Sequence, residues 1–463
     1  MDPLYRQRLR YIACDYVMLN IGWLVFNYVR FRSLPIGWVG SVGHFMALPP
    51  VVLGQVLLPL LAVGIYALSG YYNHPYFKSR VDDVLNTAGV SAVAALMMFF
   101  AVLVNDDIPE RLLNYQLLAI LWALLAVPVY AGRHYITAHT RRRIRSGRLG
   151  FDAIVVGAGP KARALAARVE RAPAKTGLRI AGFATDGAAD GAMSLDDAAL
   201  MVEQGRVRNI IIADESTDMA RTADLMSRFI PLGCNVYMAP DRYNLLTMRP
   251  RVQSVSNEPL INISSPGMSA CTANLKRIGD IVVSALAMVA LLPVYAVLAI
   301  AVKADSAGPA LYSQERVGYR GRLFRIYKFR TMRPDAEAAG PQLSRDGDPR
   351  ITRVGAVLRK YRLDELPQFW NVLLGQMSLV GPRPEREHFE RLMAERAPYV
   401  ALLHRVRPGL TSWGVVKHGY ACSVDEMLER LSYDMIYIEN VSLGVDLRII
   451  LHTINTVLTG KGV

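Results

Sequence analysis

The sequence predicts a membrane protein of mixed α and β structure. Its expected parts are a four-helix transmembrane unit, a parallel α/β domain, and a C-terminal α/β domain that carries a re-entrant membrane helix. Hydrophobic residues make up 52% of the 463 residues, and the mean hydropathy of +0.21 is high for a soluble protein. Four apolar stretches fill the first third of the chain, and strand-like runs alternate with helical patterns after them. At about 150 residues per domain, this length predicts roughly three units.

Each of the four apolar stretches is long enough to cross a bilayer. They cover approximately residues 11–31, 45–68, 84–104 and 115–135, and about 20 apolar residues span a hydrocarbon core of about 30 Å. We therefore assign residues 1–140 to a four-span transmembrane unit. The first stretch is as long as a membrane span and no small-residue cleavage site follows it, so no cleavable signal is expected.

Positive charge in the connections predicts the orientation of these spans. Basic residues precede the first stretch, occupy the second connection and follow the fourth stretch: Arg6, Arg8, Arg10; Lys78, Arg80; Arg141, Arg142, Arg143, Arg145, Arg148. The third connection is acidic, with Asp106, Asp107 and Glu110, whereas Arg30 and Arg32 make the first connection a mild exception. Because basic connections stay in the cytoplasm, both ends of the unit are expected there.

The overall charge and the cysteines limit the classes of partner. A formal net charge of +14 suits phospholipid headgroups or phosphorylated substrates, and a positive-inside bias with a solvated basic surface explains it equally well. No helix-turn-helix or RNA-binding signature is recognisable, so nucleic acid is not expected as a partner. The four cysteines lie far apart without a Cys-x-x-Cys pair, which indicates neither a zinc site nor a disulfide framework.

Residues 151–250 have the pattern of a parallel α/β domain. The run FDAIVVGAG is an apolar strand and a glycine turn, and a helix through Val169 follows; further strands are expected at 178–183, 209–214 and 234–240. The turn from Gly157 to Ala162 has the context of a dinucleotide-binding fingerprint. Pro160 lies inside this turn and no clear acidic residue ends the second strand, so a structural or regulatory module and a nucleotide site both stay open. The polar residues 251–274 predict a linker.

The fifth apolar run, residues 281–302, is predicted to enter the membrane and turn back. Four crossings return the chain to the cytoplasm, so a fifth would export the basic region that follows it. Pro293, near the middle of the run, removes a backbone donor and can bend the helix. A proline-kinked helix that spans the membrane is the alternative.

The densest chemistry lies within residues 359–368. Two adjacent carboxylates, Asp364 and Glu365, follow three basic side chains, and Pro367 places the pair at a bend or a helix start. Carboxylates next to a phosphate suit Mg²⁺, and an aspartate can attack phosphorus as a nucleophile. The plainer alternative is a solvated surface pair that makes ordinary ion pairs.

Basic residues flank this pair on both sides. The string FRIYKFR alternates apolar and basic residues as a strand does, so one face presents Lys328 and Arg330 or, on the other side, Arg325. Downstream, Pro382 and Pro384 fix the backbone around Arg383, which could clamp a diphosphate. Each basic residue alone is more often a solvated charge, and their concentration around one carboxylate pair indicates a site. We assign substrate binding to these residues: Arg316, Lys328, Arg330, Arg362, Arg383, Glu385.

Five strings are distributed over residues 275–415: KRIGD, QERVGYRG, FRIYKFRTM, LRKYRLDELPQFWNVLLGQMSLVGPRPE and RVRPGLTSWG. Together they resemble the polyprenyl-phosphate sugar-phosphate transferases of the monotopic phosphoglycosyl transferase superfamily. The remainder is similar to the long-form members, which have four N-terminal spans and a Rossmann-like cytoplasmic domain. The resemblance implies a phosphoglycosyl transferase domain over residues 275–463, with a re-entrant helix at 281–302 bent at Pro293.

The same resemblance implies a reaction and its location. Asp364 matches a nucleophile that attacks the β-phosphate of a UDP-sugar, expels UMP and holds the sugar phosphate until undecaprenyl (polyprenyl) phosphate accepts it. Glu365 matches the second member of the pair, which binds Mg²⁺ with Asp364 or acts as an acid or base. The protein would initiate exopolysaccharide or related glycan assembly in the bacterial inner membrane, with its catalytic domain on the cytoplasmic face. The large middle domain favours a homodimer.

Two other functions account for less of the sequence. A soluble oxidoreductase built on the Gly157 turn would need a Tyr-x-x-x-Lys pair, and residues 151–250 contain none. A non-enzymatic membrane scaffold or transport component of polysaccharide export would leave the carboxylate pair of the large basic C-terminal domain unexplained.

Overall fold

The computed structural model describes residues 3–33, 40–73, 75–76, 80–102, 111–171, 177–186, 191–213, 219–239, 260–264, 267–336, 340, 342–344, 347–419 and 421–460. The chain divides into two compact units, Met1–Leu149 and Gly150–Val463. Lys78, the acidic third connection at 103–110, and residues 251–259 and 265–266 of the expected linker lie outside the described residues.

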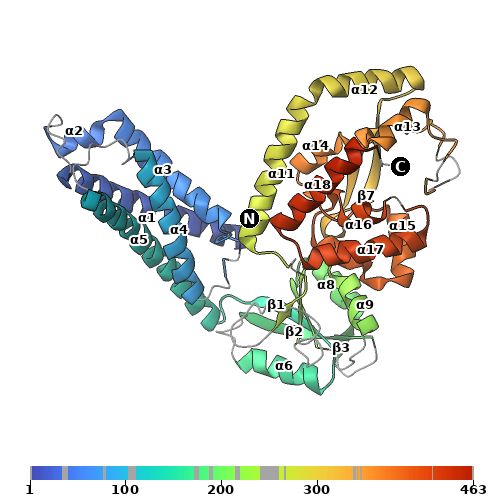
Figure 1. Cartoon of the computed structure of the whole chain (residues 1–463). Coiled ribbons are helices and arrows are strands. Elements are labelled where there is room, and N and C mark those ends of the chain that lie inside the picture. Colours follow the sequence, from blue (N-terminus) through green and yellow to red (C-terminus); the bar gives the residue numbers. More distant parts are fainter. Residues whose placement is uncertain are drawn as a thin grey trace. The chain divides into compact units, whose positions relative to one another are not determined.

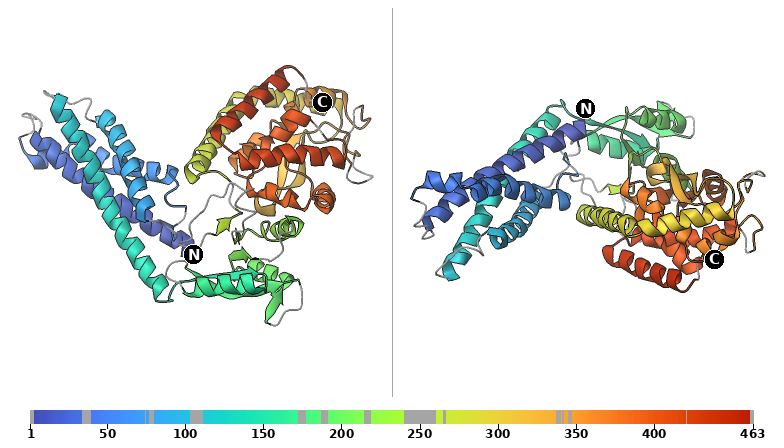
Figure 2. Two further views of the ribbon diagram at one scale, coloured as in Figure 1. Left: turned by 60° about the horizontal axis from the view of Figure 1, so that its bottom comes forward. Right: turned by 90° about the horizontal axis from the view of Figure 1, so that it is seen from above.

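The first unit is a bundle of helices. It contains α1 (Pro3–Ser33), α2 (Val42–Ala47), α3 (Pro49–Leu68), α4 (Arg80–Val102) and α5 (Arg111–Arg145). In the described part of the chain, four helices are long and apolar enough to cross a membrane, namely α1, α3, α4 and α5. The long helices α1 and α5 lie side by side, as the views agree (Figures 1 and 2). The prediction of four N-terminal membrane helices is confirmed, and the chain is a membrane protein.

A buried ion pair lies inside this bundle. Arg133 on α5 donates to Asp15 on α1 at 2.5 Å, and neither side chain is exposed to solvent. The Arg133 guanidinium also donates to Thr87 on α4, and it stacks on the rings of Tyr66 and Tyr71 at 3.9 and 3.5 Å from their centroids. Because Tyr66 belongs to α3, this one side chain contacts residues of the other three membrane helices.

The second unit begins with a six-stranded sheet in the order β3-β2-β1-β4-β5-β6. Its strands are β1 (Phe151–Val156), β2 (Leu178–Thr185), β3 (Ala192–Ser194), β4 (Asn209–Ile212), β5 (Asn235–Met238) and β6 (Ile261–Asn262), and the helices that follow β1, β3 and β4 are α6 (Pro160–Arg171), α8 (Leu195–Glu203) and α9 (Met219–Phe229). All pairs are parallel except β5 with β6. Alternate residues of β1 and β4 enter two separate apolar clusters, so the sheet is buried on both faces. The mixed α/β content expected beyond residue 150 is confirmed, and β6 lies within the expected linker.

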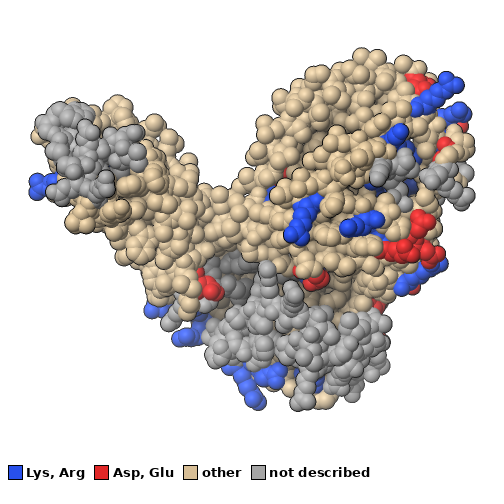
Figure 3. All heavy atoms as spheres, viewed as in Figure 1, with Lys and Arg blue, Asp and Glu red and all other residues tan. Residues whose placement is uncertain are grey.

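Two consecutive apolar helices, α11 (Ala270–Ala290) and α12 (Leu292–Asp305), contain the fifth apolar run. They meet at Leu291 with a bend of 63°, and a proline lies in the first turn of α12. The missing N–H of that proline costs nothing at a helix start, which explains why the break falls there. Apolar side chains on both helices are exposed, for example Leu286, Val289 and Ile300. Figure 3 shows a broad uncharged surface over α12, with charged side chains where this helix ends.

The remaining elements form the C-terminal part of the second unit. They are β7 (Leu311–Val317), η2 (Tyr319–Gly321), β8 (Leu323–Phe329), α13 (Arg353–Lys360), η3 (Leu363–Glu365), α14 (Gln368–Leu373), β9 (Ser378–Val380), α15 (Glu387–Arg396), η4 (Pro398–Arg405), β10 (Gly409–Thr411), α16 (Trp413–His418), α17 (Val424–Glu439) and α18 (Leu443–Leu458). Strands β7 and β8 form an antiparallel hairpin, and β9 pairs with β10 in parallel.

Both halves of the bent helix pair are attached to the segment that follows η3. Arg277 on α11 donates to the carbonyl oxygens of Val372 and Leu373 at 2.7 and 2.9 Å. Tyr295 on α12 donates to the carbonyl oxygen of Leu366 at 3.0 Å. The position of η3 is therefore fixed relative to the two apolar helices.

Candidate active site

A cavity of about 250 Å³ opens in the C-terminal part of the second unit. Its described lining includes nine basic and three acidic side chains, a difference of six positive charges: Arg316, Lys328, Arg330, Arg333, Arg350, Arg359, Arg383, Arg386, Arg430; Asp364, Glu365, Glu385. Such an excess inside a partly enclosed, low-dielectric space attracts anions more strongly than the same charges on an open surface. The cavity therefore suits a ligand with several negative charges.

The β7–β8 hairpin provides one wall of this cavity through the two-residue period of its strands. Tyr312 pairs with Lys328, Gln314 with Ile326, and Arg316 with Phe324. Residues directly opposite in a ladder share one face, so Tyr312, Arg316 and Lys328 point the same way, and all three line the cavity.

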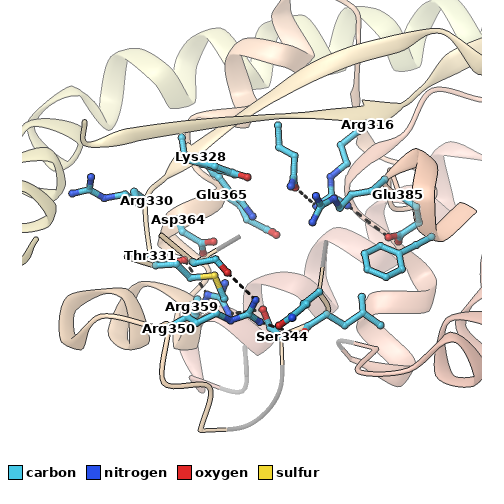
Figure 4. A pocket seen from close by; sticks show the side chains of 18 of the residues that line it. Arg316, Lys328, Arg330, Thr331, Ser344, Arg350, Arg359, Asp364, Glu365 and Glu385 are labelled. Carbon is cyan, nitrogen blue, oxygen red and sulfur yellow. Dashed lines mark hydrogen bonds and ion pairs between the residues drawn. The ribbon is translucent and has the colours of Figure 1, made fainter. Parts of the chain in front are cut away.

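The carboxylate pair lies on the short turn η3. Arg362, immediately before it, has a left-handed backbone with φ of 51°, which is uncommon for a residue with a side chain. This conformation ends α13 and turns the chain so that Asp364 and Glu365 both enter the cavity wall, with 4% and 7% of their surfaces exposed. Figure 4 shows the two carboxylates next to each other beneath the strand that carries Lys328.

The ionised form of Asp364 is destabilised by burial. Burial, and then repulsion from Glu365, raise the pKa of Asp364 to about 6, although Lys328 and Arg359 oppose the shift. Its Oδ1 atom is buried and accepts no hydrogen bond from any described residue. A buried acceptor without a partner is rare, and it marks a position where a ligand can bind.

Glu365 is stabilised in its ionised form. Arg383 Nη2 donates to Glu365 Oε1 at 3.0 Å. Burial by itself would raise the pKa of Glu365, but Arg383, Arg362 and Lys328 outweigh it and hold that pKa below its usual value. The two adjacent carboxylates therefore differ, since Glu365 is compensated by a guanidinium and Asp364 is left with a free oxygen.

The basic side chains of the hairpin are affected by their confinement. Burial in the cavity, together with Arg316, lowers the pKa of Lys328 to about 8, while Asp364 and Glu365 act in the opposite direction. Burial lowers the pKa of Arg316 to about 10 despite the nearby Glu385. An incoming anion would relieve this crowding of positive charge.

Arg359 is directed to the cavity by a close approach of α13 to the end of β8. Its guanidinium donates to Thr331 Oγ1 at 3.0 Å and to Ser344 Oγ at 3.1 Å (Figure 4). A Cβ atom at Gly355 would lie 2.1 Å from the Thr331 carbonyl oxygen, so the helix can approach only because this residue is glycine. These bonds hold the guanidinium plane before any ligand binds.

Comparison with known proteins places the chain in a family. A model described as bacterial sugar transferase matches residues 271–460. A curated relative from Caulobacter vibrioides, a UDP-glucose:undecaprenyl-phosphate glucose-1-phosphate transferase, is 41% identical over 186 residues, which cover 40% of this chain and 70% of that protein. The chain belongs to the bacterial sugar transferase family. A second model, described as a CoA-binding domain, matches residues 67–240.

Two further relatives match this chain over a smaller share of their own length. A UDP-N-acetylgalactosamine-undecaprenyl-phosphate N-acetylgalactosaminephosphotransferase of Aeromonas hydrophila is 46% identical over 190 residues, 41% of this chain and 45% of that protein. A UDP-glucose:undecaprenyl-phosphate glucose-1-phosphate transferase of Escherichia coli K12 is 32% identical over 267 residues, 57% of this chain and 58% of that protein. The chain spans about half the length of these two relatives.

Most of the site residues predicted from the sequence come together, and two have a different position. Arg316, Lys328, Arg383 and Glu385 line the cavity with the carboxylate pair. Arg330 also lines the cavity, but its guanidinium donates to Ser306 and Ala307, the two residues that follow α12 in the chain. It therefore points away from Asp364 (Figure 4). Arg362 does not line the cavity and acts on Glu365 through its charge. Pro293 lies at the helix bend.

The residues present fit Mg²⁺. Within the described ranges no cluster of three or more His, Cys, Asp or Glu side chains could hold a metal ion. Mg²⁺ needs no such cluster, because it is usually held by one or two carboxylates together with substrate phosphates and water. The unpartnered Oδ1 atom of Asp364, next to an ionised Glu365, offers that donor set.

Two buried charged residues of α17 were missed by the sequence reasoning. Arg430 lines the cavity and donates to Glu385, and Asp434 accepts the backbone N–H of Gly414 at 2.9 Å. Burial raises the pKa of Asp434 to about 6, although Gly414 and Arg430 oppose the shift. Their spacing of four residues puts both on one helix face, but Asp425 and Glu429 have the same spacing, so the sequence holds no signal that separates the buried pair from solvated charges.

Proposed function

We propose that this sugar transferase moves a sugar 1-phosphate from a UDP-sugar to undecaprenyl phosphate, releases UMP, and so initiates exopolysaccharide or related glycan assembly. The observation that carries the proposal is the buried Asp364–Glu365 pair in a cavity with a strongly basic lining. The names of the relatives, which specify glucose or N-acetylgalactosamine for those proteins, support the same reaction class.

The first step begins at the carboxylate of Asp364 in the cavity wall. Its carboxylate attacks the phosphorus that carries the sugar, the bond from that phosphorus to the bridging oxygen breaks, and UMP leaves with the electron pair. The sugar phosphate remains on Asp364 as an acyl phosphate. Lys328, Arg316 and Arg383 neutralise the charge that grows on the phosphoryl oxygens and on the leaving group. Their preorganisation by the hairpin and by Glu365 favours the transition state over the free donor.

The second step returns the enzyme to its starting state. A phosphate oxygen of the lipid attacks the same phosphorus, and the bond to Asp364 breaks, which regenerates the carboxylate and gives a lipid diphosphate sugar. Because the donor product leaves before the lipid reacts, the kinetics are ping-pong. Glu365, held ionised by Arg383, keeps its position through both steps.

Mg²⁺ belongs to the proposal as a cofactor held by Asp364 and Glu365. It would supply positive charge next to the transferring phosphoryl group, which is the usual contribution of this ion in phosphoryl transfer. The chain's own part is to keep two carboxylates adjacent in a buried turn and to surround them with fixed guanidinium groups.

The bent pair α11–α12 is proposed to re-enter the membrane and leave on the side from which it came. The 63° bend, the proline at the start of α12 and the exposed apolar side chains support this path. Together with the positive-inside pattern, this path supports a cavity on the cytoplasmic face of the inner membrane, where a lipid phosphate and a soluble nucleotide sugar could both reach η3.

Thiol labelling tests this path. Cys271, at the start of α11, is exposed and serves as one reporter, and A307C after α12 serves as the other, each in a chain without the other cysteines. Both reporters should react with a membrane-impermeant maleimide in inside-out vesicles and stay unreactive in intact spheroplasts. Reaction from opposite sides would establish a spanning helix. S41C, between the first two spans, provides the control for the outer side.

The sheet of the second unit is proposed to be a Rossmann-like module with a structural or regulatory role. The parallel order around β1 and the Gly157–Gly159 turn between β1 and α6 support this assignment, and the CoA-binding model covers the same region. Equilibrium dialysis of the full chain against coenzyme A or NAD would decide whether the turn binds a nucleotide.

The reaction is tested by UMP release from purified full-length protein with Mg²⁺, polyprenyl phosphate and a panel of UDP-sugars. We expect release from one sugar, and loss of release in D364N, which keeps the shape of the side chain but not its nucleophilic charge. Without lipid, mass spectrometry should find a sugar phosphate on Asp364 in the wild type. Equal turnover by D364N would exclude this nucleophile, and no turnover with any sugar would favour a scaffold role in polysaccharide export.

Size-exclusion chromatography with light scattering tests the expected homodimer.

A further inference from the structure

Arg430 on α17 is a buried residue whose side chain lines the cavity. Only 5% of its surface is exposed, and its Nη2 atom donates to Glu385 Oε1. The second oxygen of Glu385 lies 3.7 Å from Arg316 Nη1. The Glu385 carboxylate therefore lies between two guanidinium groups, one from α17 and one from β7. A donor diphosphate would be repelled by this carboxylate, so the role left to Glu385 is to hold the two arginines.

Asp434, four residues further along α17, faces the same segment. It is 3% exposed, and its Oδ1 atom accepts the backbone N–H of Gly414 at 2.9 Å. Its Oδ2 atom is 3.5 Å from the backbone N–H of Arg383, which is a longer contact. Both neighbours are donors, so both oxygens must accept, which an ionised carboxylate can do and an amide cannot.

The approach of α16 to α17 depends on a residue without a side chain. A Cβ atom at Gly414 would lie 2.4 Å from Arg430 Cγ, 2.9 Å from the Arg430 carbonyl oxygen and 3.0 Å from Asp434 Oδ1. Any side chain at this position would have to displace Arg430, Asp434 or both. The packing of α16 against α17 thus fixes two buried charges that have no role in the chemistry proposed above.

We infer that Arg430 and Asp434 are positioning residues, which hold the Arg383–Glu385 segment so that Arg316 and Arg383 form a preorganised clamp for the donor diphosphate. The inference rests on the proposed function and adds to it a determinant of donor recognition. Arg430 acts through Glu385 on Arg316, and Asp434 acts through the backbone of Arg383 on the side chain that contacts Glu365. The ligand class is a nucleoside diphosphate sugar with Mg²⁺.

The inference predicts a loss confined to the donor half-reaction. In ping-pong kinetics, kcat/KM for each substrate depends on its own half-reaction, so kcat/KM for the UDP-sugar should fall at least about tenfold in R430M. The same parameter for polyprenyl phosphate should stay within about twofold. Without Arg430, the Glu385 carboxylate has Arg316 as its remaining ion-pair partner, and its incompletely neutralised charge repels the donor diphosphate.

Matched variants separate this positioning role from a general loss of structure. R430K keeps the charge and should recover most of the loss, whereas D434N should lower donor kcat/KM because it offers one acceptor to two donors. E439Q removes an exposed carboxylate from the same helix, 59% exposed in its pair with Arg405, and should behave as the wild type. Calorimetry with UDP and Mg²⁺ should give the same order of affinities. G414A pushes α17 away from α16 at Arg430 and Asp434 without removing either side chain, and it replaces R430M if that variant does not fold.

The outcomes distinguish the inference from the proposed function. Absence of transfer by the wild type with every UDP-sugar overturns the proposed function and this inference with it. If the wild type transfers a sugar phosphate and folded R430M, D434N and G414A match E439Q in donor kcat/KM and UDP affinity, the inference alone is wrong. Equal losses for donor and lipid, with no recovery in R430K, would also overturn it, since that pattern is expected of a purely structural residue.

Discussion

Arg383 Nη2 donates to Glu365 Oε1 at 3.0 Å, and the two side chains are 20% and 8% exposed. This ion pair joins the segment between Pro382 and Pro384 to the turn that carries Asp364, the nucleophile of the proposed reaction. With Arg362 and Lys328 it holds the pKa of Glu365 below its usual value, whereas burial and the Glu365 charge raise the pKa of Asp364, so the position of this guanidinium contributes to the difference between the two adjacent carboxylates.

Breaking this pair should reveal strong coupling between its members. R383M leaves a buried carboxylate uncompensated, and E365Q leaves a guanidinium without its counter-charge. In a double-mutant cycle on kcat/KM for the donor, we expect a coupling energy of about 0.5–3 kcal/mol. The exposed pair of Glu315 and Arg325, which lie opposite each other in the β7–β8 hairpin, is the control, and its coupling energy should be near zero. Strict additivity of R383M and E365Q would show that the contact has no role in turnover.

Lys328 should limit activity at alkaline pH. Its pKa is lowered to about 8, so the ammonium loses its proton and its positive charge as the pH rises through that value. Donor kcat/KM should then fall by about tenfold for each further pH unit. K328R retains its charge and should lose this alkaline limb, whereas K303R, at the exposed end of α12, should keep it. The measurement is a pH profile of donor kcat/KM at fixed Mg²⁺, and an unchanged limb in K328R would assign it to another group.

Arg330 should contribute to stability more than to substrate binding. Its guanidinium donates to the Ser306 carbonyl, the Ser306 hydroxyl and the Ala307 carbonyl at 2.7–2.9 Å. Hydrogen bonds from a charged group contribute about 1.5–3 kcal/mol each, so R330M should lower the thermal midpoint while donor KM changes less than about threefold. R325M, which changes an exposed arginine of β8, is the control. A large rise in donor KM with an unchanged midpoint would support the substrate-binding role predicted from the sequence.

The sequence predicted those features that depend on local patterns. Long apolar runs gave the four membrane helices, and alternation gave the strand that carries Lys328. The same alternation put Arg330 on the face of Lys328, but β8 ends at Phe329, and beyond that point the strand period no longer determines direction. Arg330 instead turns to the end of α12, an element that is distant in sequence. The bend that Pro367 predicts next to Asp364 is the turn η3.

Arg430 and Asp434 could not be recognised in the same way. A charged residue on an amphipathic helix is usually solvated, and nothing within α17 distinguishes these two from Glu429 or Glu439. Their burial depends on the approach of α16 at Gly414, which is a tertiary contact. Strand β6 has two residues, Ile261 and Asn262, too few for a period of two to be detected.

The buried pair of Asp15 and Arg133 should determine the stability of the membrane unit. D15N removes the counter-charge of a fully buried guanidinium, which costs about 3–5 kcal/mol, whereas the double variant D15L/R133M removes both charges and should recover most of that loss.

Cys14, next to Asp15 on α1, is half-buried against α5 and reports opening of this unit by its rate of thiol labelling in detergent. We expect faster labelling in D15N, a rate near the wild type in the double variant, and no change in D152N, which breaks the exposed pair with Arg179. Labelling of D15N at the wild-type rate would mean that the aromatic rings of Tyr66 and Tyr71 are sufficient to stabilise the cation without its counter-ion.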